Sequence, residues 1–215
     1  MNKYSVELIG AFFLFLTIGT AAVLGAAGPL APFAIGVTLM VMVYAGGHIS
    51  GAHYNPAVTI AVFIRGRCEG KDVAPYIVSQ LIGAGLAALV VSKLFGPAVL
   101  EAGKEIERFT IENSGAVVAA ELLFTFALVY VILNVATSKN TEGNSYFGLA
   151  IGCTVMAGAF TVGGISLGGF NPAVSTALCI TGKLGWADSW MHYLPQFLGA
   201  VLAAFTFKGL NPDDR

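Results

Sequence analysis

The sequence predicts an all-α membrane protein with six transmembrane helices and two re-entrant half-helices that form an inverted repeat. The first observation is the tripeptide Asn-Pro-Ala, which occurs at 55–57 and again at 171–173, a spacing of 116 residues (171 − 55 = 116). The second is the absence of Asp, Glu, Lys and Arg from long blocks of the chain, namely 8–64, 73–92, 122–138, 143–182 and 189–207. The third is a set of short motifs that recur in the same order in both halves, the pattern expected of an internal repeat.

The composition is that of a membrane protein. Charged residues make up 11% of the chain, less than half of the roughly 25% of a soluble domain, and the mean hydropathy is +0.79. A membrane-spanning helix needs about 20 mainly apolar residues. The block 8–64 therefore suits two spans and a re-entrant piece, and the block 143–182 suits one span and a re-entrant piece.

The charge balance and the sparse chemistry of the chain exclude several functions. With 11 basic and 12 acidic residues there is no basic patch, so we expect no nucleic-acid partner. The three cysteines are scattered and show neither a disulfide framework nor metal-ligand spacing. The sequence shows no nucleophile–base pair, no cluster of metal ligands and no phosphate-binding loop. We therefore expect no enzymatic activity, no catalytic residue, no metal and no cofactor.

The first half, 1–95, is predicted to contain spans at about 5–25, 31–50 and 73–95 and a half-helix at about 56–64. Glu7 lies near the start of the first span. The glycine-rich stretch 46–54 is predicted to be irregular backbone. Asparagine suits the position that caps a helix, and proline suits its first turn, so a helix is expected to begin directly after Asn55. The third span carries the motif Gln80-x-x-Gly-Ala.

The second half, 115–215, is predicted to repeat this order after a charged connecting loop at 96–114. Its spans are expected at about 115–137, 146–164 and 188–207, and its half-helix at about 172–180. Glu121 corresponds to Glu7, and Gln196-x-x-Gly-Ala corresponds to the motif at Gln80. Because each half has three spans, an odd number, the two repeats must have opposite orientations. This is the inverted repeat of membrane channels and transporters.

The orientation follows from the loop cations, which are more frequent on the cytoplasmic side. One side is predicted to hold seven of them, Lys3, Arg65, Arg67, Lys71, Lys139, Lys208 and Arg215, and the other side four, Lys93, Lys104, Arg108 and Lys183. We therefore expect both termini in the cytoplasm. The compact length suggests a prokaryotic plasma membrane.

The two Asn-Pro-Ala copies predict a pore. Irregular backbone at membrane depth is tolerated only where it is buried in protein or lines a wet cavity. The carbonyl groups of the two irregular segments can therefore line a water path; they belong to Gly51, Ala52, His53, Leu167, Gly168 and Gly169. Two half-helix starts place positive dipole ends at mid-membrane, where they repel cations. Asn55 and Asn171 can donate to a passing water, which then cannot pass a proton along the chain. The pattern favours passive conduction of small neutral solutes.

Glu7 and Glu121 are the acidic residues placed to lie within spans. An acid in a span is costly and usually functional, but this pair is related by the repeat and has no basic partner nearby. We interpret both as braces that accept hydrogen bonds from the irregular backbone before each half-helix. His48 and His53 are both interpreted as bonding to loop backbone, and His48 is taken as a third bracing residue. A gating or pore-lining role for His48 or His53 is the alternative.

The stretch 47–59, with its Gly-His-Ile-Ser-Gly-Ala-His-Tyr-Asn-Pro-Ala-Val-Thr sequence, resembles the first signature of the aquaporin (major intrinsic protein) family. The resemblance extends over nearly the whole chain. It implies an hourglass fold, a homotetramer in the membrane lipid with one pore per subunit, and passive flux of water or small uncharged solutes. The short loops and Ser175 resemble the water-selective branch.

One position departs from the family pattern. The second signature of the family normally continues Asn-Pro-Ala-Arg, and Val174 stands here at the position of the arginine. That arginine belongs to a narrow filter, whose other positions, by the resemblance, are Ile35, Ala159 and Gly168. This filter is apolar, mostly small and uncharged. We expect relaxed selectivity, with passage of ammonia, hydrogen peroxide, urea or a small polyol, unless Tyr54 or Phe170 narrows the pore elsewhere.

Two other functions fit an inverted repeat. A secondary transporter would need a coupling-ion site at the membrane midplane, for which Glu7 and Glu121 are the candidates. A non-conducting structural member of the same fold is the other alternative, and a flux assay distinguishes it from a channel.

Overall fold

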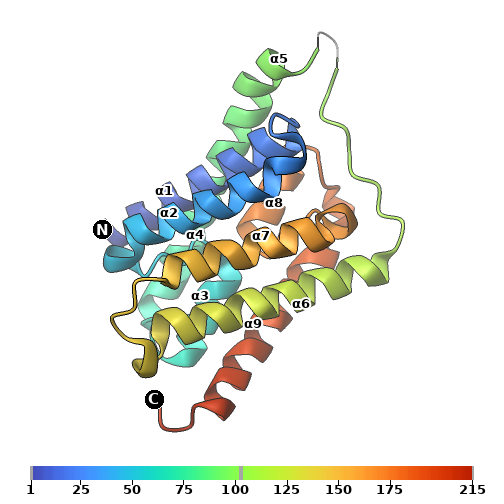
Figure 1. The fold of residues 1–215 in the computed structure, drawn as a ribbon. Helices are drawn as coiled ribbons and strands as arrows, with labels where there is room; N and C mark the ends of the chain where they lie inside the picture. The colour runs from blue at the N-terminus through green and yellow to red at the C-terminus, as the bar shows by residue number, and fades with distance from the viewer. Residues whose placement is uncertain (1, 102–103, 215) are drawn as a thin grey trace.

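The computed structural model describes residues 2–101 and 104–214, and within these ranges the chain is helical with no strand. Figure 1 shows a bundle of long tilted helices with two short helices between them. The helices are α1 (Asn2–Ile18), α2 (Ala31–Ser50), α3 (Pro56–Arg65), α4 (Gly70–Val90), α5 (Gly96–Val99), α6 (Ser114–Ile132), α7 (Phe147–Ser166), α8 (Pro172–Ile180) and α9 (Trp190–Leu210). Single π-helical turns prolong three of them, at Gly19–Val23, Val91–Phe95 and Leu133–Thr137.

Five helical segments of the described chain are long and apolar enough to cross a membrane: Asn2–Val23, Gly28–Ser50, Gly70–Val99, Ser114–Thr137 and Phe147–Ser166. The sixth predicted span corresponds to α9, which is of similar length at 21 residues. It carries His192, Tyr193 and Gln196 in its first two turns, which lowers its hydropathy. The half-helices are α3 and α8. The predicted all-α fold of six spans and two half-helices is therefore confirmed.

The structure differs from the sequence prediction at two kinds of boundary. The segment 96–114 was expected to be a loop, but α5 occupies its first four residues and continues the direction of α4 (Figure 1); residues 102 and 103 lie outside the described ranges. The glycine-rich stretches before the half-helices are shorter than expected, because α2 continues to Ser50 and α7 to Ser166. The irregular backbone is confined to 51–54, the first re-entrant loop, and 167–170, the second re-entrant loop.

The helices pack in the same pairs in each half of the sequence. α1 contacts α4 and α2, and α6 contacts α9 and α7, while α2 packs against α7 between the halves. Each half-helix crosses to the other half, so that α3 packs on α9 and α8 packs on α4. Both termini lie on one side of the bundle, which we call the termini side (Figure 1). The division into two repeats at 96–114 remains a prediction with which these contacts agree.

The glycine of each Gln-x-x-Gly-Ala motif lies at a backbone-to-backbone contact. A methyl group on Gly83 would collide with the carbonyl oxygen of Leu8, and one on Gly199 would come within 2.5 Å of the carbonyl oxygen of Leu122. Small residues let membrane helices approach this closely. The motif therefore fixes the α1–α4 and α6–α9 contacts, which bring Gln80 and Gln196 beside the two span carboxylates.

Candidate functional site

The two half-helices begin at the centre of the molecule, and each is capped by its asparagine. The Asn55 side-chain oxygen accepts from the Ala57 N–H at 2.9 Å, and that of Asn171 accepts from the Ala173 N–H at 2.9 Å. The amide nitrogens reach across, because Asn55 Nδ2 donates to the Phe170 carbonyl and Asn171 Nδ2 to the Tyr54 carbonyl, both at 2.9 Å. An amide nitrogen has two donor hydrogens, so each asparagine keeps one N–H for a further acceptor.

The first re-entrant loop is attached to a buried carboxylate. Glu7 is fully buried. Its Oε1 accepts from Ser50 Oγ at 2.7 Å and from the His53 N–H at 2.9 Å. Its Oε2 accepts from the Tyr54 N–H and from Gln80 Nε2, both at 2.7 Å. These four donors are the contacts that a bracing residue needs, and they occupy both carboxylate oxygens.

The second re-entrant loop repeats this arrangement around Glu121, which is also fully buried. Its Oε1 accepts from Ser166 Oγ at 2.7 Å and from the Gly169 N–H at 3.0 Å. Its Oε2 accepts from the Phe170 N–H at 2.8 Å and from Gln196 Nε2 at 2.7 Å. Every donor lies 116 positions after its counterpart in the first loop. The two loops are therefore held in the same way, although the acids themselves are 114 positions apart.

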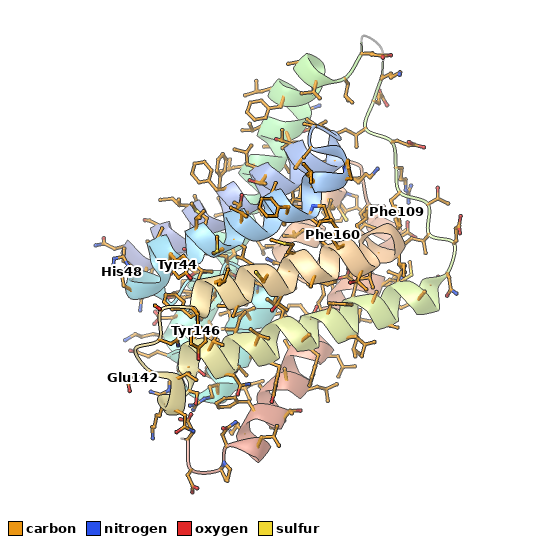
Figure 2. All side chains as sticks on the ribbon, in the orientation of Figure 1. Tyr44, His48, Phe109, Glu142, Tyr146 and Phe160 are labelled. Atoms are coloured by element: carbon orange, nitrogen blue, oxygen red, sulfur yellow. The ribbon has the colours of Figure 1, made fainter. Side chains whose placement is uncertain are left out.

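The three histidines differ in their surroundings. His48 was expected to bond to loop backbone, but it is exposed in the last turn of α2, and its side chain makes none of the side-chain hydrogen bonds found within the described ranges (Figure 2). The cause is the extension of α2 to Ser50, which turns residue 48 outward. His53 is buried, with Nδ1 3.1 Å from Thr59 Oγ1 and its ring edge against Tyr76. His192, which the sequence analysis did not single out, lies beside Glu121 and is fully buried.

A narrow cavity of about 60 Å³ runs past the two half-helix starts. Such a volume holds a short file of water molecules, since about 10–15 Å³ suffices for one. Asn55 and Asn171 line it together with all four predicted filter residues, Ile35, Ala159, Gly168 and Val174. Ala52, His53, Leu167 and Gly169, whose carbonyls were expected to line a path, also border it. Among its described lining residues there is no Asp, Glu, Lys or Arg.

The wall of the narrow cavity is an apolar surface that the sequence analysis missed. Four helices contribute residues spaced by four positions, the repeat that places side chains on one helix face. The residues are Leu14, Ile18 and Ala22 of the first span, Ile35, Leu39 and Val43 of α2, Leu128 and Ile132 of α6, and Ile151, Val155 and Ala159 of α7. This spacing was the available signal, although fully apolar spans contain other stripes of the same kind.

The two aromatic residues that precede the asparagines pack their rings against the helices behind the loops. The Tyr54 ring packs against Gly10 and Gly46, and its hydroxyl donates to the Met42 carbonyl at 3.0 Å. The Phe170 ring stacks on Phe124 with centroids 5.4 Å apart. Both side chains are almost fully buried behind the loops. Tyr54 is still among the residues that border the narrow cavity, whereas Phe170 is not, so a constriction at Tyr54 stays a prediction.

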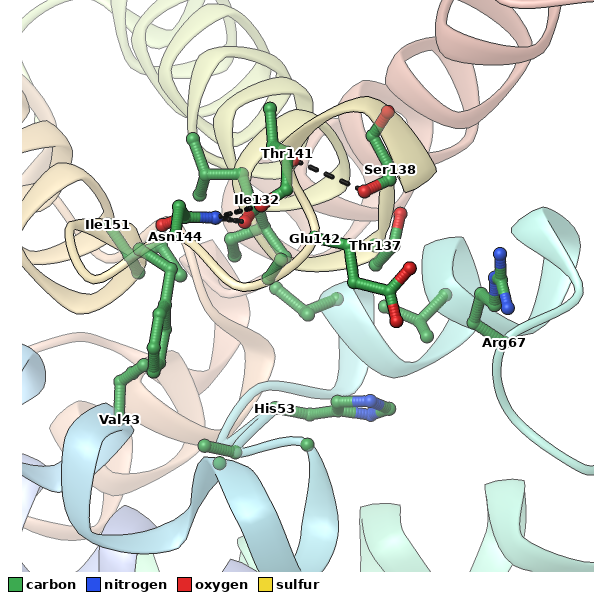
Figure 3. A pocket seen from close by; sticks show the side chains of 18 of the residues that line it. Val43, His53, Arg67, Ile132, Thr137, Ser138, Thr141, Glu142, Asn144 and Ile151 are labelled. Atoms are coloured by element: carbon green, nitrogen blue, oxygen red, sulfur yellow. Dashed lines mark hydrogen bonds between the residues drawn. The ribbon is translucent and has the colours of Figure 1, made fainter. Parts of the chain in front are cut away.

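A wide cavity of about 570 Å³ opens from the narrow one toward the termini side. The two share Val43, Ala52, His53, Val58, Ile132 and Ile151, so they are successive parts of one path. Gly51 borders the wide part. Figure 3 shows its polar rim, where Arg67, Glu142 and Asn144 surround the opening above His53. Dashed lines there mark the bonds that hold the segment 138–144 in place.

A buried ion pair ties this rim to the end of α3. Arg65 Nη2 lies 2.6 Å from Asp214 Oδ1, and both side chains are at most 5% exposed. Asp214 Oδ2 accepts from the Lys139 N–H at 3.0 Å, and Arg65 also donates to the Thr137 carbonyl at 3.3 Å. Burial opposes ionisation of Asp214, but the Ser138 hydroxyl, the Lys139 N–H and Arg65 outweigh it and hold the pKa of this carboxyl below its usual value. We call this group of contacts the Asp214 tether.

The family model of the major intrinsic proteins matches residues 1–207. The chain belongs to the major intrinsic protein family. As a member of this family it is an integral, multi-pass membrane channel for water and small solutes, and it is not an enzyme.

Proteins similar to this chain are named either as glycerol uptake facilitators or as aquaporins. Glycerol uptake facilitator protein-like 6 of Lactiplantibacillus plantarum is 36% identical over 219 residues, which cover 100% of both chains. Aquaporin NIP1-2 of Arabidopsis thaliana is 34% identical over 235 residues, which cover 100% of this chain and 76% of the plant protein. The X-ray structure of the aquaglyceroporin from Plasmodium falciparum superposes with a TM-score of 0.82 at 22% identity, covering 98% of this chain and 96% of that one. The likeness to this major intrinsic protein fold extends over both halves.

Proposed function

We propose that this channel conducts water and also uncharged solutes larger than water, such as ammonia, hydrogen peroxide, urea or a small polyol. The observation that carries the proposal is the lining of the narrow cavity, where Ile35, Ala159, Gly168 and Val174 meet without a charged side chain. A fixed cation at residue 174 would attract water and repel other cations. Valine supplies neither effect, and alanine and glycine leave room for a larger solute.

Proton exclusion is assigned to the half-helix starts. Each of Asn55 and Asn171 has one amide hydrogen that is not used in the cap or the cross-link. A water that accepts from both amides with its oxygen must point its own hydrogens away from the centre in both directions. It cannot relay a proton through that point, and the positive ends of α3 and α8 oppose a hydronium ion at the same place.

The transporter alternative lacks a free ligand for a coupling ion. Glu7 and Glu121 each accept four hydrogen bonds from the protein, at both oxygens. An ion would have to displace donors that hold the re-entrant loops. We therefore assign these acids to support of the loops and not to ion binding.

The basic and apolar side chains on the surface support an orientation and a lipid-facing surface for this chain. Lys3, Arg65, Arg67, Lys71, Lys139 and Lys208 lie on the termini side, which we assign to the cytoplasm by the excess of basic residues. Exposed apolar side chains on the helix surfaces, such as Leu123, Leu194 and Phe205, would contact lipid or neighbouring subunits. We further assign the chain to a prokaryotic plasma membrane, as a homotetramer with a pore in each subunit.

Stopped-flow light scattering of proteoliposomes tests the proposal, with sucrose, urea and glycerol gradients applied to the wild type, Val174→Arg and Val174→Leu. We expect water, urea and glycerol to pass the wild type faster than empty liposomes. Val174→Arg should lower the urea and glycerol permeabilities relative to water by about tenfold or more. Val174→Leu enlarges the side chain without adding a charge, so it separates the effect of size from the effect of charge. A wild type that passes water but not urea or glycerol would refute the relaxed selectivity, and one that passes none of them would refute the channel for these solutes.

A further inference from the structure

The two re-entrant loops adopt the same unusual backbone with different residues. Left-handed φ values occur at Gly51 (83°), Ala52 (52°) and Tyr54 (50°) in the first loop, and at Leu167 (69°), Gly168 (61°) and Phe170 (47°) in the second. Glycine adopts this region freely, whereas a residue with a Cβ atom is strained in it. Leucine therefore occupies, in the second loop, the position that glycine occupies in the first.

The loops also differ two residues later, in the opposite sense. His53 in the first loop corresponds to Gly169 in the second. A methyl group on Gly51 would lie 3.3 Å from His53 Nε2, so the imidazole takes the space beside residue 51. Gly169 has no side chain to take the space beside residue 167. Each loop thus carries one bulky group here, an imidazole on the termini side and an isobutyl group on the opposite side.

The placement of Leu167 puts that isobutyl group at the filter. Leu167 lines the narrow cavity, is half-buried, and packs against the buried apolar core. The filter residues Ile35 and Val174 line the same cavity. Strained backbone persists where the surrounding structure enforces it, and it gathers at functional positions. Phe170 does not border the cavity, and the other two residues of the second re-entrant loop are glycines, so Leu167 is the residue of this loop with a large side chain that borders it.

We propose that Leu167 is a specificity-determining residue of the channel. Its side chain closes part of the space that Val174, Ala159 and Gly168 leave open, and it presents an apolar surface that forms no hydrogen bond with a solute. Solutes that carry several hydrogen-bonding groups, such as urea and glycerol, therefore pass more slowly than water at this point. This inference rests on the proposed function, because it concerns the selectivity of the same path.

Two substitutions separate the size of the side chain from the strain of the backbone. Leu167→Ala removes most of the side chain and keeps a Cβ atom in the left-handed region, while Leu167→Gly removes both. We expect each to raise the urea-to-water and glycerol-to-water permeability ratios in proteoliposomes by about tenfold, the scale of a change in apolar pocket size. Leu167→Gly alone should raise the thermal midpoint. Leu123→Ala, on the exposed face of α6, is the matched control and should leave both ratios unchanged.

Unchanged ratios in both Leu167 variants, whatever the thermal midpoints, would overturn the proposal and leave Leu167 a structural residue. The wild-type trace decides the proposed function separately. If the wild type passes no solute faster than empty liposomes while Leu167→Gly or Leu167→Ala conducts, the proposed function is wrong for the native chain and Leu167 is its constriction. If neither variant conducts either, both proposals are overturned.

Discussion

The polar clusters beneath the two re-entrant loops contain the same groups, but one of these groups comes from a different element in each. Both have a carboxylate, a serine at the end of the preceding helix and a glutamine from the crossing span. In the first cluster the imidazole belongs to the loop itself, and His53 Nδ1 lies 3.1 Å from Thr59 Oγ1. In the second it belongs to α9, and His192 Nδ1 lies 3.3 Å from Ser175 Oγ.

The difference changes what the imidazole can reach. His53 lines both cavities, whereas His192 is 0% exposed and borders neither of the two. A methyl group on Gly169 would lie 3.3 Å from His192 Nδ1, so the histidine of α9 fills the space that a loop side chain would occupy. The repeat therefore preserves the support of the loop backbone, while the side chains that face the path have diverged. Two pairs of substitutions test this distinction, and a third pair compares the two ends of the path.

The largest effect is expected where the clusters agree. In Glu7→Gln and Glu121→Gln one acceptor oxygen becomes an NH₂ group that faces the donors of the loop. Leaving buried donors without an acceptor should lower the free energy of unfolding by about 3 kcal/mol or more in each case. Thermal unfolding in detergent, with flux in parallel, measures it. Glu112→Gln is the control, because Glu112 is exposed and borders neither cavity. A loss in only one of the two variants would break the equivalence of the clusters.

An intermediate effect is expected where the clusters differ. His53→Phe places an apolar ring against the path and should reduce water permeability severalfold. His192→Phe should leave permeability unchanged, because His192 lines neither cavity. Its Nε2 has no hydrogen-bond partner within the described ranges, but the substitution removes the Nδ1–Ser175 Oγ contact and puts a larger ring into a fully buried site. The free energy of unfolding should therefore fall by about 1–3 kcal/mol. Equal losses of flux in the two variants would show that His192 also acts on the path.

The smallest effect is a local change in protease cleavage, expected at the two ends of the path. The Asp214 tether is buried, whereas the Arg108–Asp188 pair on the opposite side, 2.8 Å long, joins an exposed Arg108 to a half-buried Asp188. Exposed ion pairs contribute little. Asp214→Asn should therefore increase protease cleavage within 137–144, and Asp188→Asn should not change cleavage near 183–188. Equal behaviour of the two variants would contradict the assignment of a tether.

The pH dependence of the tether follows from the lowered pKa of Asp214. A depressed carboxyl pKa gives a contribution that is complete above the unfolded value, near 3.8, and is lost as the pH falls through the lower folded value. The wild type should therefore resist cleavage at neutral pH and resemble Asp214→Asn only in acid below that value. Cleavage of the wild type that rises already near neutral pH would show that another group controls the rim.

The sequence predicted the fold because its signals are local. Uncharged blocks set the spans, and Asn-Pro fixed the start of each half-helix to the residue. The predicted filter residues were located by their distance from those asparagines, and all four border one cavity because α2, α7, α8 and the second re-entrant loop hold them there. Glycine was a misleading signal at residue 46. It lies within a helix, and its missing side chain makes room for the Tyr54 ring and not for irregular backbone.

What remained hidden depends on contacts between distant parts of the chain. Arg65 and Asp214 are separated by 149 positions and share no motif. His192 joins the second cluster only because α9 crosses α6 at Gly199, and nothing in its local sequence indicates this. Leu167 was identified for its carbonyl alone, since strain in its backbone appears only in three dimensions. Helix ends at Ser50 and Ser166 likewise depend on packing, which overrides the weak helix propensity of glycine.

Each asparagine is hydrogen-bonded to the opposite loop, Asn55 to the Phe170 carbonyl and Asn171 to the Tyr54 carbonyl. These cross-links have a consequence for the temperature dependence of the transport rate. A carrier that works by alternating access must separate the halves at its centre once in every turnover, and its rate follows the activation energy of that motion. Here the centre is joined by two hydrogen bonds of 2.9 Å between buried groups. Transport through it needs no such cycle, so its rate should rise with temperature only as steeply as the viscosity of water falls.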